Sequence, residues 1–117
     1  MTRLKSVVVT GGVQSAYSNM SNIRFVKPHI IVATPGRLID LIENHGLKIN
    51  SSKYQILDEG DRMLDMGFQR DIELIQGFMP EAQTMIFSAT VPKYIQDIAK
   101  NYMRSPIMID LVGDENT

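Results

Sequence analysis

Three acidic residues follow a short apolar run near the middle of the chain. Asp58, Glu59 and Asp61 come directly after residues 54–57, and one glycine separates the last two. Carboxylates at the end of a buried strand suit Mg²⁺, which prefers one or two carboxylates together with waters and phosphate oxygens. In that chemistry Asp58 would serve the cation and Glu59 would orient and deprotonate an attacking water. The same charges also favour a helix N-terminus by about 0.3–1 kcal/mol, so the cluster alone leaves both interpretations open.

A second polar cluster occupies residues 34–37. Thr34, Gly36 and Arg37 bring a hydroxyl, an unobstructed backbone N–H and a guanidinium to the expected start of a helix. Such groups together form an anion site. Gly11 and Gly12 follow an earlier apolar run, where they either admit a ligand close to the backbone or make an ordinary tight turn.

Short apolar runs alternate along the chain with segments of helical periodicity. The runs, most of them rich in β-branched residues, predict buried strands over residues 6–10, 29–33, 54–58, 84–88 and 107–111. Apolar spacing predicts helices within residues 37–45, 71–79 and 92–103, the last with Pro92 in its first turn and Thr90 as a possible cap. This order predicts an α/β fold with a mostly parallel sheet flanked by helices.

Each unusual polar cluster follows one of the first four predicted strands. The clusters are residues 10–12, 34–37, 58–61 and 88–90. Ligands of parallel sheets lie beyond the carboxyl ends of the strands, so these clusters are expected on one edge of the sheet. A loop or a helix cap would explain any one of them, whereas four in register predict a shared ligand site.

Composition sets only broad bounds on function. The chain has 117 residues and a net charge of −1, which suggests one small domain or part of a larger one and gives no global argument for a nucleic-acid partner. Cysteine is absent, which fits a reducing intracellular setting, and the apolar runs are too short to span a membrane. The N-terminus lacks the apolar segment of a secretory signal.

Taken together, these motifs resemble the DEAD-box family of ATP-dependent RNA helicases. The resemblance rests on Gly-Gly at 11–12, TPGRL at 34–38, LDEGDRMLDMGF at 57–68 and FSAT at 87–90, in this order and spacing. It implies the C-terminal part of the first RecA-like (P-loop NTPase) domain over residues 1–111 and the start of an interdomain linker over 112–117. The DMGF run and the IDLVG ending are most similar to the Gu-like helicases, a nucleolar and organellar branch. The sequence does not distinguish nucleolus, cytoplasm and organelle as the location of the protein.

The resemblance also implies roles for individual residues. Asp58 would coordinate Mg²⁺ through water, Glu59 would activate the hydrolytic water, and Asp61 would pair with Ser88 and Thr90 to link nucleotide state to domain closure. The implied RNA-binding residues, which would grip the sugar-phosphate backbone of a single strand, are Gly11, Gly12, Thr34, Pro35, Gly36 and Arg37. ATP, Mg²⁺, RNA and a second RecA-like domain are the expected ligands and partners.

The sequence departs from the family pattern in two ways. Gly60 stands where the family motif has alanine, a change that adds no atom. No G-x-x-x-x-G-K-[ST] phosphate loop occurs, so we expect a fragment that hydrolyses no ATP alone and leaves a sheet edge exposed. The competing interpretations are a non-catalytic RNA- or protein-binding module and an unrelated NTPase with accidental motif matches.

Overall fold

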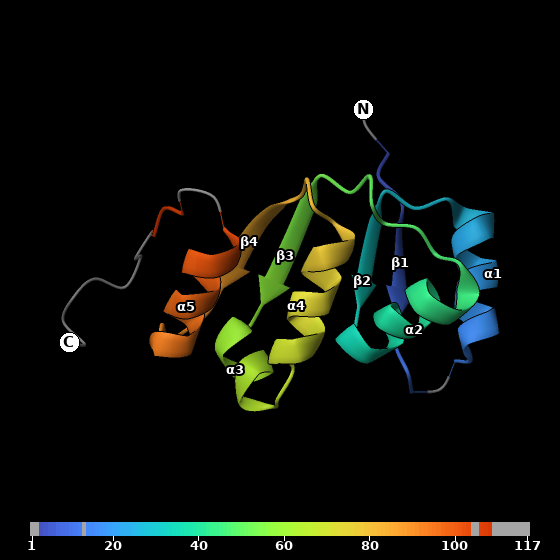
Figure 1. Cartoon of the computed structure of the whole chain (residues 1–117). Helices are drawn as coiled ribbons and strands as arrows, with labels where there is room; N and C mark the ends of the chain where they lie inside the picture. The colour runs from blue at the N-terminus through green and yellow to red at the C-terminus, as the bar shows by residue number, and fades with distance from the viewer. Residues whose placement is uncertain (1–2, 13, 104–105, 109–117) are drawn as a thin grey trace.

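The computed structural model describes residues 3–12, 14–103 and 106–108 (Figure 1). Strands and helices alternate along this part of the chain, except for two successive helices before the last strand. The elements are β1 (Ser6–Val9), α1 (Ala16–Val26), β2 (Ile30–Ala33), α2 (Pro35–His45), β3 (Tyr54–Asp58), α3 (Gly60–Asp65), α4 (Gln69–Phe78), β4 (Gln83–Phe87) and α5 (Lys93–Tyr102). The predicted α/β class is confirmed.

The strands are parallel, as predicted, but among the described residues they form two separate pairs. β1 pairs with β2, with Val9 opposite Ala33, and β3 pairs with β4, with Asp58 opposite Phe87. Each pair is joined by a helical crossover, so each is a βαβ unit with its own ladder. All four arrows in Figure 1 point the same way, which brings the carboxyl ends of the strands to one end of the molecule.

Helix α2 connects the two units through packing. Its Leu41 is fully buried in one apolar cluster with Val7, Val9 and Met20. Other α2 side chains pack against a second cluster, formed by Ile49, Ile75 and Met79; they are Leu38, Ile39 and Ile42. The helix starts with Pro35 in its first turn and ends at Gly46, whose φ of 78° lies in the left-handed region that glycine favours.

Helix α1 was missed by the sequence prediction. Its sequence is rich in Ser and Asn and has only a weak apolar stripe, so periodicity gave little signal. A local cap defines its start, because the backbone N–H of Ser18 donates to the Ser15 hydroxyl at 3.1 Å. It ends at Lys27, which adopts φ 52° and ψ 64°, a conformation that is unfavourable for a side chain with a Cβ.

The end of the chain differs from the prediction of a fifth strand over residues 107–111. Residues 106–108 have no regular secondary structure, and the Ile107 and Met108 side chains are exposed. Residues 109–117, which include the rest of that strand and the expected linker, lie outside the described residues. No helix in the described ranges is long and apolar enough to cross a membrane.

One face of each strand pair is left uncovered by the described residues. Burial alternates along β1 and β3, where Val7, Val9 and Leu57 are buried and their sequence neighbours are exposed. The exposed apolar side chains of the strands are Val8, Ile30, Val32, Tyr54, Ile56 and Phe87. Patches of this kind on a small protein mark a surface that another segment or partner covers.

Candidate functional site

The four polar clusters lie at the carboxyl ends of the strands, and the structure joins them in two groups. Residues 10–12 lie beside Thr34, whose backbone N–H donates to the Val9 carbonyl at 3.1 Å. Residues 58–61 lie beside Ser88 and Thr90, because Asp58 and Phe87 are register partners. Each strand pair therefore carries its own half of the expected ligand edge (Figure 1).

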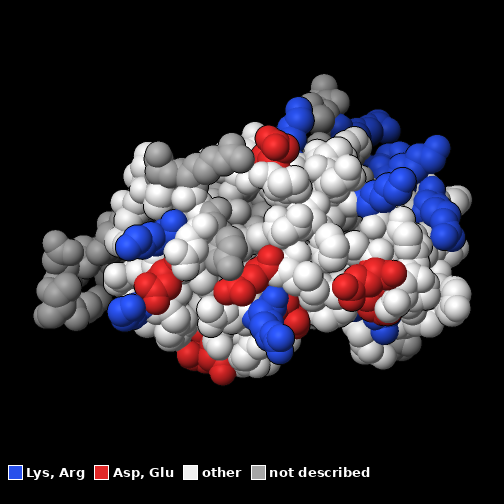
Figure 2. All heavy atoms as spheres, viewed as in Figure 1, with Lys and Arg blue, Asp and Glu red and all other residues white. Residues whose placement is uncertain are grey.

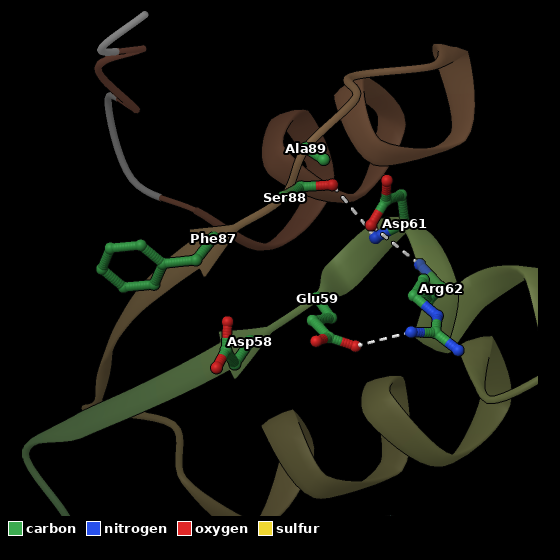
Figure 3. A pocket seen from close by; sticks show the side chains of 7 residues that line it. All are labelled: Asp58, Glu59, Asp61, Arg62, Phe87, Ser88 and Ala89. Carbon is green, nitrogen blue, oxygen red and sulfur yellow. Dashed lines mark hydrogen bonds and ion pairs between the residues drawn. The ribbon is translucent and has the colours of Figure 1, made fainter. Parts of the chain in front are cut away.

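A shallow pocket of about 230 Å³ forms at the end of β3 and β4. Figure 3 shows the seven side chains that line it: Asp58, Glu59, Asp61, Arg62, Phe87, Ser88 and Ala89. Asp58 is the last residue of β3 and is exposed, so its carboxylate is accessible to a ligand. Within the described ranges no three His, Cys, Asp or Glu side chains gather as a metal site. The donor set fits a cation that takes one carboxylate and completes its shell with water and phosphate.

Glu59 adopts an unusual backbone conformation between β3 and α3. Its φ of 55° lies in the left-handed region, which a side chain with a Cβ occupies only where its surroundings impose it. The conformation turns the chain sharply after Asp58, and Figure 3 shows the Glu59 carboxylate pointing toward Arg62. The two charged groups lie 3.5 Å apart and both are largely exposed, so the ion pair holds Glu59 only weakly.

Asp61 connects the start of α3 to the segment after β4. Its carboxylate accepts hydrogen bonds from the Thr90 hydroxyl at 2.8 Å and from the Thr90 backbone N–H at 3.2 Å. The Asp61 backbone N–H donates to the Ser88 hydroxyl at 3.1 Å, and this hydroxyl donates to the Thr90 carbonyl at 2.6 Å. The structure thus brings together the three residues that the sequence analysis paired.

The hydrogen bonds of Asp61 favour its charged form. The Thr90 hydroxyl is the largest influence and lowers the pKa of Asp61 below its ordinary value, because it stabilises the charged carboxylate. Burial acts in the opposite direction, and the backbone N–H groups of Arg62 and Thr90 contribute further lowering. Thr90 does not cap α5, contrary to the prediction, since Pro92 occupies the cap position and the Thr90 hydroxyl is committed to Asp61.

A hydrogen bond between α3 and α5 was not predicted. The Tyr94 hydroxyl donates to the Asp65 carboxylate at 2.6 Å. This hydrogen bond, reinforced by burial and by the nearby negative charges of Asp65 and Asp61, raises the pKa of Tyr94 to about 12. In the sequence Tyr94 belongs to the apolar stripe of its helix, and nothing in the spacing points to a partner on α3.

Arg37 is fixed by a polar network under the Gly-Gly loop. Its Nη1 donates to the Asn19 side chain at 2.7 Å and to the Gln14 carbonyl at 2.9 Å. The Asn19 amide in turn donates to the Gln14 side chain at 3.0 Å, and Asn19 is completely buried. A Cβ added to Gly11 would lie 3.7 Å from Arg37 Nη2, so the loop passes directly over the guanidinium. Asn19 and Gln14 were missed because no motif or periodicity marks them.

The remaining residues of this half form the N-terminus of α2. Thr34 precedes the helix and makes no side-chain capping hydrogen bond, while Pro35 is buried in the first turn. Gly36 is exposed, and a Cβ added to it would meet no atom within 4 Å. The first turn of an 11-residue helix therefore presents its backbone N–H groups to an open surface, which is the geometry that binds an anion.

Gly60 allows the close approach of α3 to β4. It is buried, and a Cβ built on it would lie 2.9 Å from Ile86 Cγ2 and 3.5 Å from Ile95 Cδ1. A real Cβ does not approach another carbon this closely, so glycine is the residue that the observed packing fits. The substitution of glycine for the family alanine is thus matched by the packing of neighbouring side chains.

Solved structures with the same architecture place the fold in the RecA-like class of α/β domains. A DEAD box protein from Methanococcus jannaschii matches with a TM-score of 0.80 and 38% identity, over 88% of this chain and 28% of that one. The yeast DEAD-box splicing factor Prp28 matches with a TM-score of 0.79 and 34% identity, over 86% of this chain and 23% of that one.

Sequence comparisons agree with the fold. The DEAD/DEAH box helicase family model matches residues 1–98, and the chain belongs to this family. It is 40% identical over 115 residues to the chloroplastic DEAD-box ATP-dependent RNA helicase 3A of maize, and 43% identical over 117 residues to ATP-dependent RNA helicase DBP3 of Debaryomyces hansenii. These matches cover 97% and 98% of this chain, but only 15% and 21% of the lengths of the two relatives. The assignment to the Gu-like branch stays a prediction.

Proposed function

We propose that the chain forms the C-terminal part of the first RecA-like domain of an ATP-dependent RNA helicase. It contributes part of a nucleotide site and part of an RNA-binding edge. The observation that carries the proposal is the hydrogen-bonded link from Asp61 to Ser88 and Thr90, which ties the end of β3 to the end of β4 beside the exposed Asp58. Family membership and the names of the relatives support the activity.

In the nucleotide half, each carboxylate has a separate task. Asp58 would hold Mg²⁺ through a water molecule, and Glu59 would orient the water that attacks the terminal phosphate. ATP with Mg²⁺ would supply the phosphoryl group that is transferred. The weak ion pair with Arg62 leaves Glu59 able to turn toward that water. Asp61, whose pKa is lowered by its Thr90 hydrogen bond, holds the segment after β4 against α3.

In the RNA half, the N-terminus of α2 and the Gly-Gly loop form the binding edge. Thr34, Gly36 and the backbone N–H groups of the first turn contact phosphate, while Gly11 and Gly12 let the strand approach closely. Pro35 sets the backbone of this turn, and Arg37 adds positive charge from its fixed position beneath the loop. Contacts of this kind position a strand without reading bases, so binding is expected to be largely independent of sequence.

The activity of the whole enzyme requires more than these residues. The second RecA-like domain is proposed as the partner that closes over the nucleotide and RNA. No stretch of the 117 residues has the pattern of a phosphate loop, so this chain is expected to hydrolyse no ATP and unwind no RNA by itself. A non-catalytic RNA-binding module is the second candidate, favoured by the Asn19–Arg37 network, which fixes Arg37 through residues of this chain alone.

The experiment is RNA-stimulated ATP hydrolysis by the longest product of the reading frame that contains this chain. Glu59→Gln should abolish hydrolysis and preserve RNA binding, whereas Glu81→Gln, an exposed glutamate outside the pocket, should leave both unchanged. Hydrolysis that survives Glu59→Gln would contradict the assigned role. A product that binds RNA but never hydrolyses ATP would favour the non-catalytic module.

A further inference from the structure

The charges of the chain are unevenly distributed along its length. Residues 1–53 contain seven Lys and Arg and two Asp and Glu, whereas residues 54–117 contain five and eleven. The near-neutral total therefore hides a basic half, which includes the β1–β2 unit, and an acidic half, which includes the β3–β4 unit. Asymmetry of this kind indicates a local surface for an anionic partner.

Three basic residues of the first half, Lys5, Arg24 and Lys27, lie at the end of the β1–β2 unit opposite the Gly-Gly loop. Lys5 precedes β1, and its backbone contacts His29 through two hydrogen bonds of 2.8 and 3.1 Å, which places it beside the segment after α1. Arg24 lies in the last turn of α1, and Lys27 ends the helix. Figure 2 shows Lys and Arg side chains grouped over this end of α1 and the N-terminal segment.

An exposed aromatic side chain comes from the same end of α1 as Arg24. Phe25 follows Arg24 and is 88% exposed, which is extreme for a large apolar residue of a helix. We call Lys5, Arg24, Phe25 and Lys27 the α1 basic patch. It lies at the amino ends of the strands, so it is separate from the candidate site at their carboxyl ends.

Helix stability accounts for only part of the α1 basic patch. Arg24 complements the negative end of the helix dipole, as a cation in a last turn does. Lys27 has the left-handed backbone conformation that Gly46 has at the equivalent position after α2. Glycine would adopt this conformation without strain, yet the position holds a lysine side chain. The exposure of Phe25 has no structural purpose within the described residues.

We propose that the α1 basic patch is a second contact surface for single-stranded RNA. The cations neutralise phosphates, and the exposed face of Phe25 stacks on a base, which is the combination that binds single strands without sequence preference. A lipid surface is the poorer match, because α1 is rich in Ser and Asn and lacks the apolar face that inserts into a membrane. The surface extends the proposed function, since it binds RNA without nucleotide.

The test compares charge reversal at two places on the 117-residue chain. Arg24→Glu/Lys27→Glu changes the α1 basic patch, and Arg70→Glu/Lys100→Glu is the control, with the same change in net charge on exposed residues of α4 and α5. Binding of a labelled oligouridylate is measured by fluorescence anisotropy at several salt concentrations, with circular dichroism to verify folding. The patch variant should bind at least about tenfold more weakly, and the slope of log Kd against log salt should fall by about 1.4, since each lost phosphate contact on a single strand removes about 0.7.

Phe25 provides a second measurement that charge does not affect. Phe25→Leu keeps an apolar side chain but removes the aromatic face, and it should weaken binding by about fivefold or more with an unchanged salt slope. Equal loss in the patch and control variants, or no loss with Phe25→Leu, would overturn the proposal. So would binding of the chain to phosphatidylserine vesicles, but not to oligouridylate, through Arg24 and Lys27.

The outcome is separable from that of the proposed function. Thr34→Glu places a negative charge at the N-terminus of α2 and should weaken RNA binding through the carboxyl-end site alone. Loss with Thr34→Glu but not with Arg24→Glu/Lys27→Glu would support the RNA-binding edge and overturn the second surface. Loss only with the patch variant would support the second surface and contradict the proposed RNA role of α2.

Discussion

Replacing Gly60 with the alanine of the family motif should destabilise this chain. The added Cβ would lie 2.9 Å from Ile86 Cγ2, whereas ordinary contacts begin at 3.4 Å, so one of the two groups must move by about half an ångström. Ile86 Cγ2 is attached at a branched Cβ on β4 and has little freedom to turn away. Overpacking of this kind costs about 1–3 kcal/mol, and the better helix propensity of alanine returns about 0.5–1 kcal/mol. From the midpoints of these ranges, the expected net loss in the free energy of unfolding is about 1 kcal/mol.

Urea denaturation of the chain and of four variants measures this loss: Gly60→Ala, Gly77→Ala, Ile86→Leu and Gly60→Ala/Ile86→Leu. Gly77→Ala is the matched control, because Gly77 lies in α4 with no atom within 4 Å of an added Cβ, and it should stabilise by about 0.5–1 kcal/mol. Ile86→Leu removes the γ2 methyl, so Gly60→Ala/Ile86→Leu should recover most of the loss in a double-mutant cycle. If Gly60→Ala is as stabilising as Gly77→Ala, the packing argument is wrong.

Three further predictions concern ionisation and helix termini. Thr90→Val should raise the pKa of Asp61, which carboxyl chemical shifts can follow. Because folding lowers the pKa of Asp61, the stability that the variant loses at pH 7 should shrink as the pH falls through the pKa of Asp61 in the folded protein. Tyr94→Phe should remove the tyrosinate absorbance step near pH 12, and since folding raises this pKa, the stability that the hydroxyl provides should be present below pH 10 and disappear toward pH 12. Lys27→Gly should stabilise the chain by about 1 kcal/mol and Gly46→Lys should destabilise it by a similar amount in thermal unfolding, because both residues have positive φ.

The elements that sequence reasoning recovered are those with a strong apolar signal. The first four strands and helices α2, α4 and α5 were predicted to within two residues, since their apolar residues recur with the period of the element. Helix α1 was missed by the sequence prediction because the Ser15 cap and the buried Asn19, which fix it in the structure, produce no apolar periodicity. The predicted single sheet became two pairs, because strand order is a tertiary property that local patterns do not encode.

The candidate site shows a similar division between motif and context. Asp61, Ser88 and Thr90 were paired by resemblance to a family, and the structure places them in contact. The partners of Arg37 and Tyr94 were invisible in the sequence, because Asn19 and Asp65 come from other helices at no characteristic spacing. Local reasoning also assigned Thr90 to a helix cap, and the competing carboxylate was 29 residues away.

The placement of α2 limits how the two halves of the ligand edge, at the carboxyl ends of the strands, can move. Leu41 points into the cluster beneath β1, while Leu38 and Ile42 rest on the cluster beneath α4. Rotating the helix about its long axis would withdraw side chains from both interiors at once. An RNA strand that pulls on the first turn at Thr34 is therefore expected to move α2 along its axis. The apolar clusters on both sides of the helix would have to move with it.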